Sequence, residues 1–424
     1  MQNNNLNISV IGLGYVGLPL ALELAKKFKV QAYDININRI KELRRGKDKN
    51  NETKPNNIKK IKKRINFTHE DKDLSQSNFY IITVPTPITK KNIPDLTYLK
   101  KATKMIGKIL KKNDIVVYES TTYPGCTEEV CIPILEKYSK MKVINDFSCG
   151  YSPERINPGD TKNTLTKIDK IISSTDARSL KKIEYVYQSI LRAKVIKVQT
   201  IKIAEGAKII ENTQRDLNIA LINELMMLFN KLEINFDSVL KAANTKWNFL
   251  NFKPGLVGGH CIGVDPYYLA YKSKLIGFNP KITLSGRKIN DYMPKYLVSL
   301  FIKRLKKNYN LIKRKKKVLI MGLTFKENVK DIRNSKSFEV VNLLIKKGFN
   351  VECYDKNVIA DEIKNFKKII LIRKLKRKYY DGVFILVPHK HIKDIGINKI
   401  SKLIKKEGTI VDFKNIFGNS SYKL

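Results

Sequence analysis

The sequence predicts an α/β protein in which two doubly wound parallel sheets are joined by a helical central segment. Residues 7–34 have the pattern of a strand, a glycine turn, a helix and a second strand, and a related pattern returns from residue 317 onward. Between them, residues 203–232 contain one glycine and no proline. Strands that alternate with helices form parallel sheets, and a long apolar helix can connect two such sheets. We expect three domains: 1–200, 201–305 and 306–424.

The glycines of the first pattern indicate a dinucleotide site. Gly12, Gly14 and Gly17 form G-x-G-x-x-G directly after the strand, and Asp34 ends the second strand. Glycines permit the tight turn and let a pyrophosphate approach the helix N-terminus, while the acid accepts hydrogen bonds from the ribose hydroxyls. A carboxylate there disfavours a 2′-phosphate, so we expect a Rossmann-like domain that binds NAD.

The next two predicted strands, 79–84 and 114–118, each lead into a loop that carries hydroxyl groups. Ligands of a doubly wound sheet bind beyond the carboxyl ends of its strands, so Thr86 and Thr121 are candidate cofactor contacts. Ordinary turn residues are the alternative. A third loop, 151–159, carries Glu154, whose role the residues alone leave open.

Residues 203–232 predict a long helix that is apolar on nearly all sides. Such a helix is expected to be buried, here between two domains and as a dimer contact. Lys208 and Asn212 are four residues apart and share a face. The alternative for Lys208 is a simple ion pair on the helix, with Glu205 or Glu211.

The second sheet is predicted from an internal repeat. Lys29-Val-Gln-Ala-Tyr-Asp34 returns as Asn350-Val-Glu-Cys-Tyr-Asp355, again after a strand and a helix. The second copy lacks the glycine pattern and has a longer loop, 322–333, with Lys326, Lys330 and Arg333. Cations on such a loop suit the phosphates of a different nucleotide; a solvated basic loop is the alternative.

Cys261 lies in the glycine-rich stretch 255–268 and is a candidate nucleophile. An unpaired cysteine often serves only as a small buried apolar residue. In an NAD-dependent dehydrogenase, however, a thiol converts an aldehyde to a thiohemiacetal, which is oxidised to a hydrolysable thioester. The combination predicts a four-electron oxidation that uses two NAD. His260, its neighbour, has no evident partners for a triad, so we expect a substrate contact or a packing residue.

Composition excludes several other classes of protein. The five cysteines are scattered and suggest neither disulfides nor a metal site. No apolar run is long enough for a membrane span, and we expect a soluble, cytoplasmic protein. The 82 Lys and Arg residues outnumber 39 Asp and Glu residues, which gives a net charge of +43. The lysines are dispersed and accompany no nucleic-acid module, so we expect no nucleic-acid partner; the positive potential would instead attract an anionic nucleotide sugar.

Seven motifs together carry a family resemblance: Gly12-Leu-Gly-Tyr-Val-Gly-Leu-Pro19, Val84-Pro-Thr-Pro87, Ser120-Thr-Thr-Tyr-Pro-Gly125, Ser152-Pro-Glu-Arg155, Ala204-Glu-Gly-Ala-Lys208 with Glu211-Asn212, Gly258-Gly-His-Cys-Ile-Gly-Val-Asp-Pro-Tyr-Tyr268 and Phe325-Lys-Glu-Asn-Val-Lys-Asp-Ile-Arg333. Over its whole length the chain resembles the UDP-glucose/GDP-mannose dehydrogenase family. Within it, the chain is similar to the UDP-N-acetylhexosamine 6-dehydrogenases that supply uronic acids for bacterial surface polysaccharides.

The resemblance implies a role for individual residues. Cys261 would be the nucleophile, Lys208 would stabilise the alkoxide or thiohemiacetal oxygen, Asn212 would bond to that oxygen, Asp265 would orient water, and Glu154 would act as acid and base in hydrolysis. The implied cofactor contacts are Gly12, Gly14, Val16, Gly17, Asp34, Arg39, Thr86, Thr121 and Arg333. The implied substrate contacts are Glu154, Arg155, Lys208, Asn212, Lys253, Gly258, His260 and Lys326. From the long apolar helix we expect a homodimer or higher homo-oligomer, and from the scattered cysteines we expect no metal.

The substrate is narrowed by one departure from the family pattern. UDP-glucose dehydrogenases carry a second glutamate four residues beyond the position of Glu154, where this chain has Pro158. An acetamido sugar is therefore favoured over glucose, with the gluco, galacto and manno epimers left open. Lys253 stands where relatives are expected to have arginine, which would weaken its hold on a substrate phosphate.

Two other functions remain as alternatives. A two-electron hydroxyacid dehydrogenase of the same fold would leave Cys261 without a role. A basic nucleic-acid-binding protein with a degenerate Rossmann domain would not bind NAD.

Overall fold

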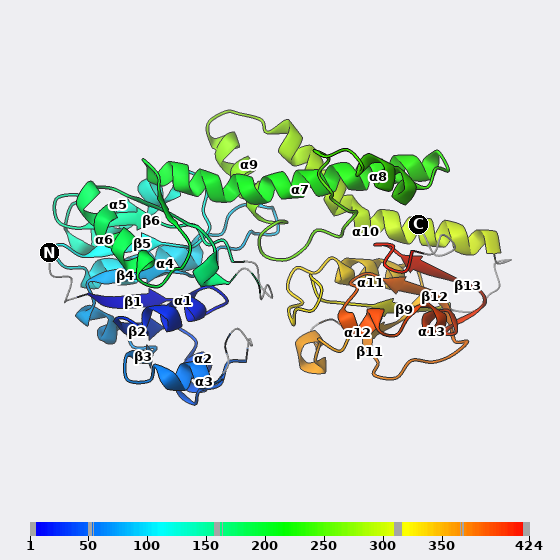
Figure 1. Cartoon of the computed structure of the whole chain (residues 1–424), viewed down its shortest axis with the longest axis horizontal. Helices are drawn as coiled ribbons and strands as arrows, with labels where there is room; N and C mark the ends of the chain where they lie inside the picture. Colours follow the sequence, from blue (N-terminus) through cyan, green and yellow to red (C-terminus); the bar gives the residue numbers. More distant parts are fainter. Residues whose placement is uncertain are drawn as a thin grey trace. The chain divides into compact units, whose positions relative to one another are not determined.

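The computed structural model describes residues 6–49, 53, 55–156, 162, 164–308, 316–364, 366 and 369–418. The chain divides into two compact units. Unit 1 comprises Met1–Glu211 and Tyr267–Phe278; unit 2 comprises Asn212–Pro266 and Asn279–Leu424. Figure 1 shows the helices and strands of both units. The predicted domain boundaries after residues 200 and 305 stay a prediction.

The sheet of unit 1 has, among the described residues, eight strands in the order β3-β2-β1-β4-β5-β6-β7-β8. All neighbouring pairs are parallel except β6 and β7. The strands are β1 (Asn7–Ile11), β2 (Lys29–Tyr33), β3 (Ile65–Thr68), β4 (Phe79–Ile82), β5 (Ile115–Tyr118), β6 (Ser148–Tyr151), β7 (Lys170–Ser174) and β8 (Val195–Lys197). The strand order reverses between β1 and β4, where a doubly wound sheet binds its ligand.

Helices accompany these strands, and their apolar faces form the core of unit 1. The helices are α1 (Gly17–Leu24), α2 (Ile37–Arg44), α3 (Pro55–Lys60), α4 (Thr97–Ile109), α5 (Ile132–Ser139) and α6 (Ala177–Gln188). Every residue of β4 and β5 is buried, as expected for central strands covered on both faces.

The sheet of unit 2 has five strands among the described residues, in the order β11-β10-β9-β12-β13, and all its pairs are parallel. They are β9 (Lys317–Met321), β10 (Asn350–Tyr354), β11 (Ile370–Leu371), β12 (Tyr380–Ile385) and β13 (Ile404–Asp412). The helices here are α8 (Phe236–Ala243), α10 (Lys281–Asn308), α11 (Ser337–Lys346), α12 (Lys390–Lys393) and α13 (Ile397–Ser401).

The internal repeat that the sequence predicts is confirmed in the backbone. Gly12 follows β1 with φ +98°, and Gly322 follows β9 with φ +91°. Asp34 accepts a hydrogen bond from the N–H of Leu13 at 2.8 Å, and Asp355 accepts one from Leu323 at 2.7 Å. The two sheets therefore share the same turn after the first strand and the same acid after the second.

Two helices are divided between the units: α7 (Ile201–Lys231) and α9 (Asp265–Leu275). The predicted long helix is confirmed in α7, but this chain alone buries it only in part, and the predicted dimer contact stays a prediction. Ile210, Leu221 and Leu228 are about half exposed. The exposed apolar residues of such a helix need not be covered by its own chain, because a second molecule can cover them.

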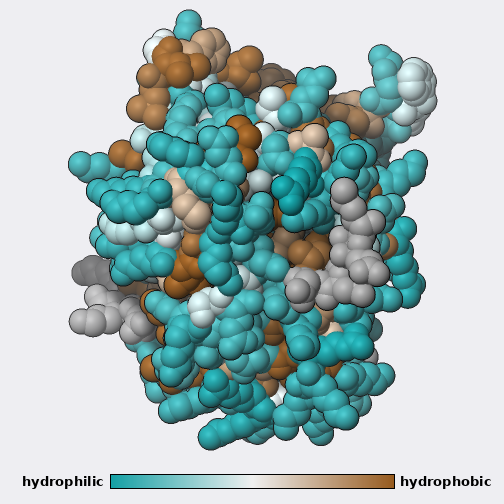
Figure 2. All heavy atoms as spheres, turned by 90° about the vertical axis from the view of Figure 1, so that its left-hand side faces the viewer, coloured by the Kyte–Doolittle hydropathy of each residue, from teal (hydrophilic) through white to brown (hydrophobic). Residues whose placement is uncertain are grey.

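The face of the molecule drawn in Figure 2 is predominantly hydrophilic, with smaller hydrophobic groups between. Within the described ranges, no helix combines the length and apolar character that a membrane span requires.

Candidate active site and cofactor site

The glycine turn after β1 has the geometry that a dinucleotide requires. A Cβ atom at Gly17 would lie 1.8 Å from the carbonyl oxygen of Gly12, and one at Gly12 would lie 3.0 Å from that of Thr83. At Gly14, by contrast, no atom lies within 4 Å of the Cβ position. Two glycines thus allow close packing, while the third leaves an open approach to the start of α1. The residues present fit the pyrophosphate of NAD.

Asp34 and Arg39 hold this turn from the end of β2. The second oxygen of Asp34 accepts a hydrogen bond from the N–H of Asn36 at 2.9 Å. Arg39 is buried; its Nε donates to the carbonyl of Leu13 at 3.1 Å and its Nη1 to Asp48 at 2.8 Å. Arg39 therefore supports the glycine turn, and its contact with NAD stays a prediction.

Thr86 and Thr121 lie together at the carboxyl ends of β4 and β5, as their positions predict. The Thr86 hydroxyl donates to the carbonyl of Thr121 at 2.7 Å. Tyr268 of α9, whose side chain is fully buried, donates its hydroxyl to the carbonyl of Thr86 at 2.8 Å. The first turns of α9 are thereby anchored to the strand ends of unit 1.

Lys208 on α7 is only 7% exposed, and within the described part of the chain it forms no hydrogen bond or ion pair. The ion pairs considered as an alternative are not formed. Glu205 accepts hydrogen bonds from Thr122, Gly125 and Thr127, and Glu211 pairs with Arg155 at 2.7 Å. A buried ammonium without a carboxylate is costly, which favours a functional role for Lys208.

Glu154 is buried after β6 and is held on both oxygens. One oxygen accepts hydrogen bonds from the N–H groups of Arg155 and Ile156 at 2.7 and 2.5 Å. The other lies 3.5 Å from the ammonium of Lys170, which pairs with Glu119 at 2.8 Å. Lys170 and Glu119 were not predicted from the sequence. The available sign was a charged residue next to a buried strand: Glu119 directly follows β5, and Lys170 begins β7. Pro158 lies outside the described residues.

Cys261 lies in a tight turn of unit 2 that leads into α9. Its carbonyl accepts the N–H groups of Val264 and Asp265 at 2.9 and 2.8 Å. All five cysteines fall within the described ranges and form no disulfide, and Cys261 alone is partly exposed. Asp265 accepts a hydrogen bond at 2.5 Å from the side-chain amide of Asn212 on α7. The structure thus joins two of the predicted catalytic residues.

The glycines before Cys261 allow this turn to pack against the 322–333 loop and the residues after it. A Cβ atom at Gly258 would lie 2.4 Å from the carbonyl oxygen of Asn334. At Gly259, with φ +83°, it would lie 2.7 Å from the ring of Phe325. A side chain at either position would push the two loops apart.

His260 and Arg333 both contact Asp331 in unit 2. His260 Nε2 lies 3.4 Å from Asp331, and Arg333 donates to both of its oxygens at 3.0 and 2.8 Å. Burial acts to raise the pKa of Asp331, but the hydrogen bonds from His260 and Arg333 hold it well below its usual range. His260 is accordingly held by an ionised acid of the loop, and its predicted contact with the substrate stays a prediction.

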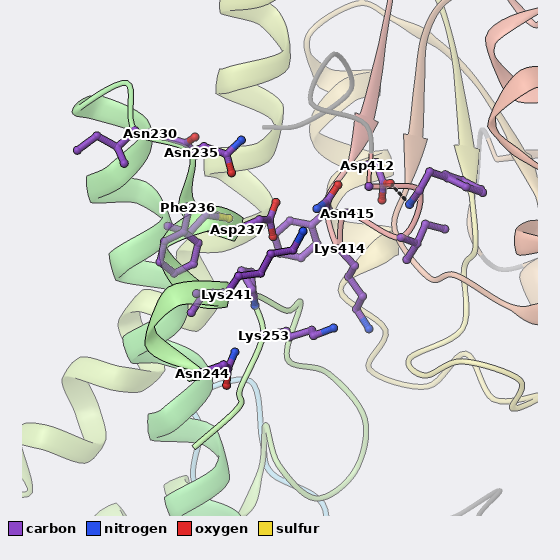
Figure 3. A pocket seen from close by; sticks show the side chains of 18 of the residues that line it. Asn230, Asn235, Phe236, Asp237, Lys241, Asn244, Lys253, Asp412, Lys414 and Asn415 are labelled. Atoms are coloured by element: carbon purple, nitrogen blue, oxygen red, sulfur yellow. Dashed lines mark hydrogen bonds between the residues drawn. The ribbon is translucent and has the colours of Figure 1, made fainter. Parts of the chain in front are cut away.

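A pocket of about 830 Å³ lies in unit 2 between α8 and the end of β13. Figure 3 shows Lys241 of α8, Lys253 of the following loop and Lys414 after β13 extending into the same space. Lys253 was predicted to contact a substrate phosphate; Lys241 and Lys414 were missed, because nothing near them in the sequence marks a site. The lining also includes one further cation and three acids, and the Lys414 ammonium lies 3.3 Å from Glu327: the additional charged residues are Arg304, Glu233, Asp237 and Asp412.

Comparison with known proteins places these features in a family. Family models of the UDP-glucose/GDP-mannose dehydrogenases match residues 6–191 (NAD binding domain), 202–292 (central domain) and 319–419 (UDP binding domain). The UDP-N-acetyl-D-glucosamine 6-dehydrogenase of Salmonella typhi is 49% identical, with 97% of each chain covered. The UDP-N-acetyl-D-mannosamine dehydrogenase of Methanocaldococcus jannaschii is 35% identical, covering 98% of this chain and 94% of that protein.

Among solved structures, the UDP-D-ManNAc dehydrogenase of Pyrococcus horikoshii superposes with a TM-score of 0.86. It is 29% identical and covers 96% of this chain and 94% of its own. The predicted α/β class with two Rossmann-like sheets is confirmed, as is the predicted NAD cofactor. The chain belongs to the UDP-glucose/GDP-mannose dehydrogenase family and is an oxidoreductase that uses NAD.

Proposed function

We propose that the chain oxidises C6 of UDP-N-acetyl-D-glucosamine to the carboxylate, for surface polysaccharide synthesis. The observation that carries the proposal is Cys261, the one partly exposed thiol of the five, in a glycine turn beside Asp265. The glucosamine epimer is favoured because the relative named for it is 49% identical, against 35% for the mannosamine one. UDP-glucose oxidation by the same route is the alternative.

The proposed reaction converts one primary alcohol to one acid. NAD, when bound, supplies the hydride acceptor, and two equivalents are consumed. The alcohol first becomes an aldehyde; Sγ of Cys261 then adds to its carbon as a thiohemiacetal, whose oxidation leaves a thioester. Water attacks that carbon, the carbon–sulfur bond breaks, and the thiol and a carboxylate are formed.

Each predicted catalytic residue has a proposed task. The Lys208 ammonium stabilises the negative oxygen in both oxidations. Asn212 donates a hydrogen bond to the same oxygen of the substrate. The contact of Asn212 with Asp265 keeps both side chains oriented. Asp265 orients the hydrolytic water, and Glu154 accepts its proton.

We propose that the pocket with Lys241, Lys253 and Lys414 takes the UDP portion of the substrate. Support comes from the lysines and the arginine in its lining, which outnumber the acids there by one, and from the match of residues 319–419 to the UDP binding domain of the family. The other implied contacts remain part of the proposal: Arg155, Gly258, His260 and Lys326 for the substrate, and Val16, Asp34, Arg39, Thr86, Thr121 and Arg333 for NAD. Arg333 is paired with Asp331 at 2.8 Å, so it would contact NAD while it keeps this ion pair.

We also propose that the chain works as a homodimer in the cytoplasm, without a nucleic-acid partner. The support for a dimer is apolar surface in unit 2: Trp247 is 91% exposed, and Leu221, Leu228 and Leu250 are each about half exposed. Light scattering on Leu228→Asp should show a smaller particle than the parent protein, while Ile144→Asp, an exposed apolar residue of unit 1, should not.

A panel of UDP-hexoses tests the substrate. With NAD present, kcat/KM should be highest for UDP-N-acetylglucosamine, by about tenfold or more over its epimers and over UDP-glucose. A preference for UDP-glucose would contradict the proposed substrate and support UDP-glucose oxidation instead. Turnover of none of the sugars would refute both.

A further inference from the structure

A cluster of ionisable side chains surrounds Glu154 in unit 1. Three of its members follow or begin neighbouring strands: Glu119 follows β5, Glu154 lies after β6, and Lys170 begins β7. The Lys170 side chain is 5% exposed and that of Glu119 is fully buried. Tyr187 of α6 completes the cluster by donating its hydroxyl to Glu119. Burying these charges is costly unless they compensate one another.

Lys170 directs its ammonium at three acceptors. It lies 2.8 Å from Glu119 Oε2, 3.4 Å from the carbonyl of Pro153 and 3.5 Å from Glu154 Oε2. An ammonium has three protons, so each acceptor can receive one. Since the other oxygen of Glu154 already accepts two backbone N–H groups, Lys170 completes the hold on that carboxylate.

One ammonium faces two buried carboxylates in this cluster. Burial raises the pKa of Glu119 to about 7, against the attraction of Lys170 and with the repulsion of Glu154. Burial opposes the charge of Lys170, but Glu119 and Glu154 outweigh it and raise its pKa. Lys170 therefore stays charged and is shared by the two carboxylates, at 2.8 Å from Glu119 and 3.5 Å from Glu154. The nearby Arg155 donates to the backbone carbonyl of Asp169 at 3.0 Å and pairs with Glu211 at 2.7 Å.

We propose that Lys170 and Glu119 are positioning residues, which hold the Glu154 carboxylate in the orientation it needs as the base of thioester hydrolysis. The proposal rests on the proposed function. In this step the water oxygen bonds to the thioester carbon while Glu154 takes a proton from it. The carbon–sulfur bond breaks with its electron pair on Sγ of Cys261, and the proton passes on to solvent. Lys170 and Glu119 touch neither water nor substrate.

The test separates hydrolysis from the oxidations before it. The full chain with Lys170→Met is mixed rapidly with NAD and UDP-N-acetylglucosamine; NADH is followed by absorbance and the Cys261 adduct by intact mass. We expect a burst of two NADH per site at the parent rate, then a steady state about 100-fold slower, with the acyl-enzyme accumulated. Lys170→Arg, which keeps the charge, should recover most of the steady-state rate.

Two further variants separate this role from a purely structural one. Lys170→Met combined with Glu119→Gln removes an acid together with the ammonium, so it folds more readily and should still accumulate the acyl-enzyme. Arg287→Met breaks another buried ion pair, with Asp216 at 2.6 Å. It should lower the melting temperature without changing the ratio of burst rate to steady-state rate.

The outcomes distinguish this inference from the function beneath it. If the parent protein makes two NADH per acid but Lys170→Met slows burst and steady state equally, or neither, the positioning role is wrong. If the parent protein never acylates Cys261, the proposed function itself fails.

Discussion

At the scale of single residues, burial separates the proposed nucleophile from the other thiols. Burial raises the pKa of the Cys149 and Cys353 thiols well above the ordinary value and leaves them unreactive. The sequence could predict Cys261 because glycines and Asp265 surround it locally. It could not predict Lys170, because its partners Glu119 and Glu154 are 51 and 16 residues away in the chain.

Replacement of Lys208 tests its proposed charge. Lys208→Ala removes the cation that stabilises the developing oxyanion, so kcat should fall about 100- to 1000-fold while KM changes little. The matched control is Lys202→Ala, which removes an exposed lysine from the same helix and should leave kcat unchanged. A rise in KM alone would return Lys208 to a binding role.

Glu205 predicts a pH dependence of stability. Burial raises its pKa to about 7, against the hydrogen bonds from Thr127, Gly125 and Thr122. Between about pH 4.5 and 7 the unfolded chain loses this proton while the folded protein keeps it, so stability falls by about 3 kcal/mol as pH rises. The melting temperature of Glu205→Gln minus that of the parent protein should therefore increase from about pH 5 to about pH 8. The opposite trend would mean that the folded state favours the carboxylate.

At the scale of elements, the local pattern predicted α7 closely but not what covers it. The predicted 203–232 compares with Ile201–Lys231 in the structure. An apolar residue such as Leu221 has the same sequence signal whether its own chain or a second copy covers it. The exposure of one side of α7 was therefore beyond the reach of sequence patterns.

The loop before Cys261 allows a paired test of glycine packing. Gly258→Ala places a Cβ atom 2.4 Å from the carbonyl of Asn334, whereas Gly263→Ala meets nothing nearer than 3.5 Å. We expect Gly258→Ala to lose turnover at least about tenfold, because the thiol is displaced, with NAD affinity unchanged. Gly263→Ala should stay near the parent rate. Steady-state turnover is measured for both variants over a range of substrate concentrations. Equal turnover would show that loop packing does not position the thiol.

At the scale of the whole molecule, two sheets share one plan but differ at the acid after the second strand. In unit 2 the fully buried His389 places its Nε2 3.0 Å from Asp355, and its Nδ1 accepts the N–H of Asn328 at 2.8 Å. The ring therefore carries its proton on Nε2 and donates it to Asp355. This hydrogen bond occupies the carboxylate whose counterpart in unit 1, Asp34, is predicted to accept hydrogen bonds from a ribose. The repeat itself was predictable from the sequence, because Tyr-Asp ends both strands. The closure was not, because it depends on a histidine 34 residues away.

The central claim is that one enzyme performs both oxidations through a thioester on Cys261. Its most direct test counts NADH against acid, for the parent protein and for Cys261→Ser, with UDP-N-acetylglucosamine as substrate. The parent protein should make two NADH per acid, and Cys261→Ser should lose acid formation while it still binds NAD. One NADH per aldehyde from the parent protein, or undiminished acid formation by Cys261→Ser, would contradict the claim.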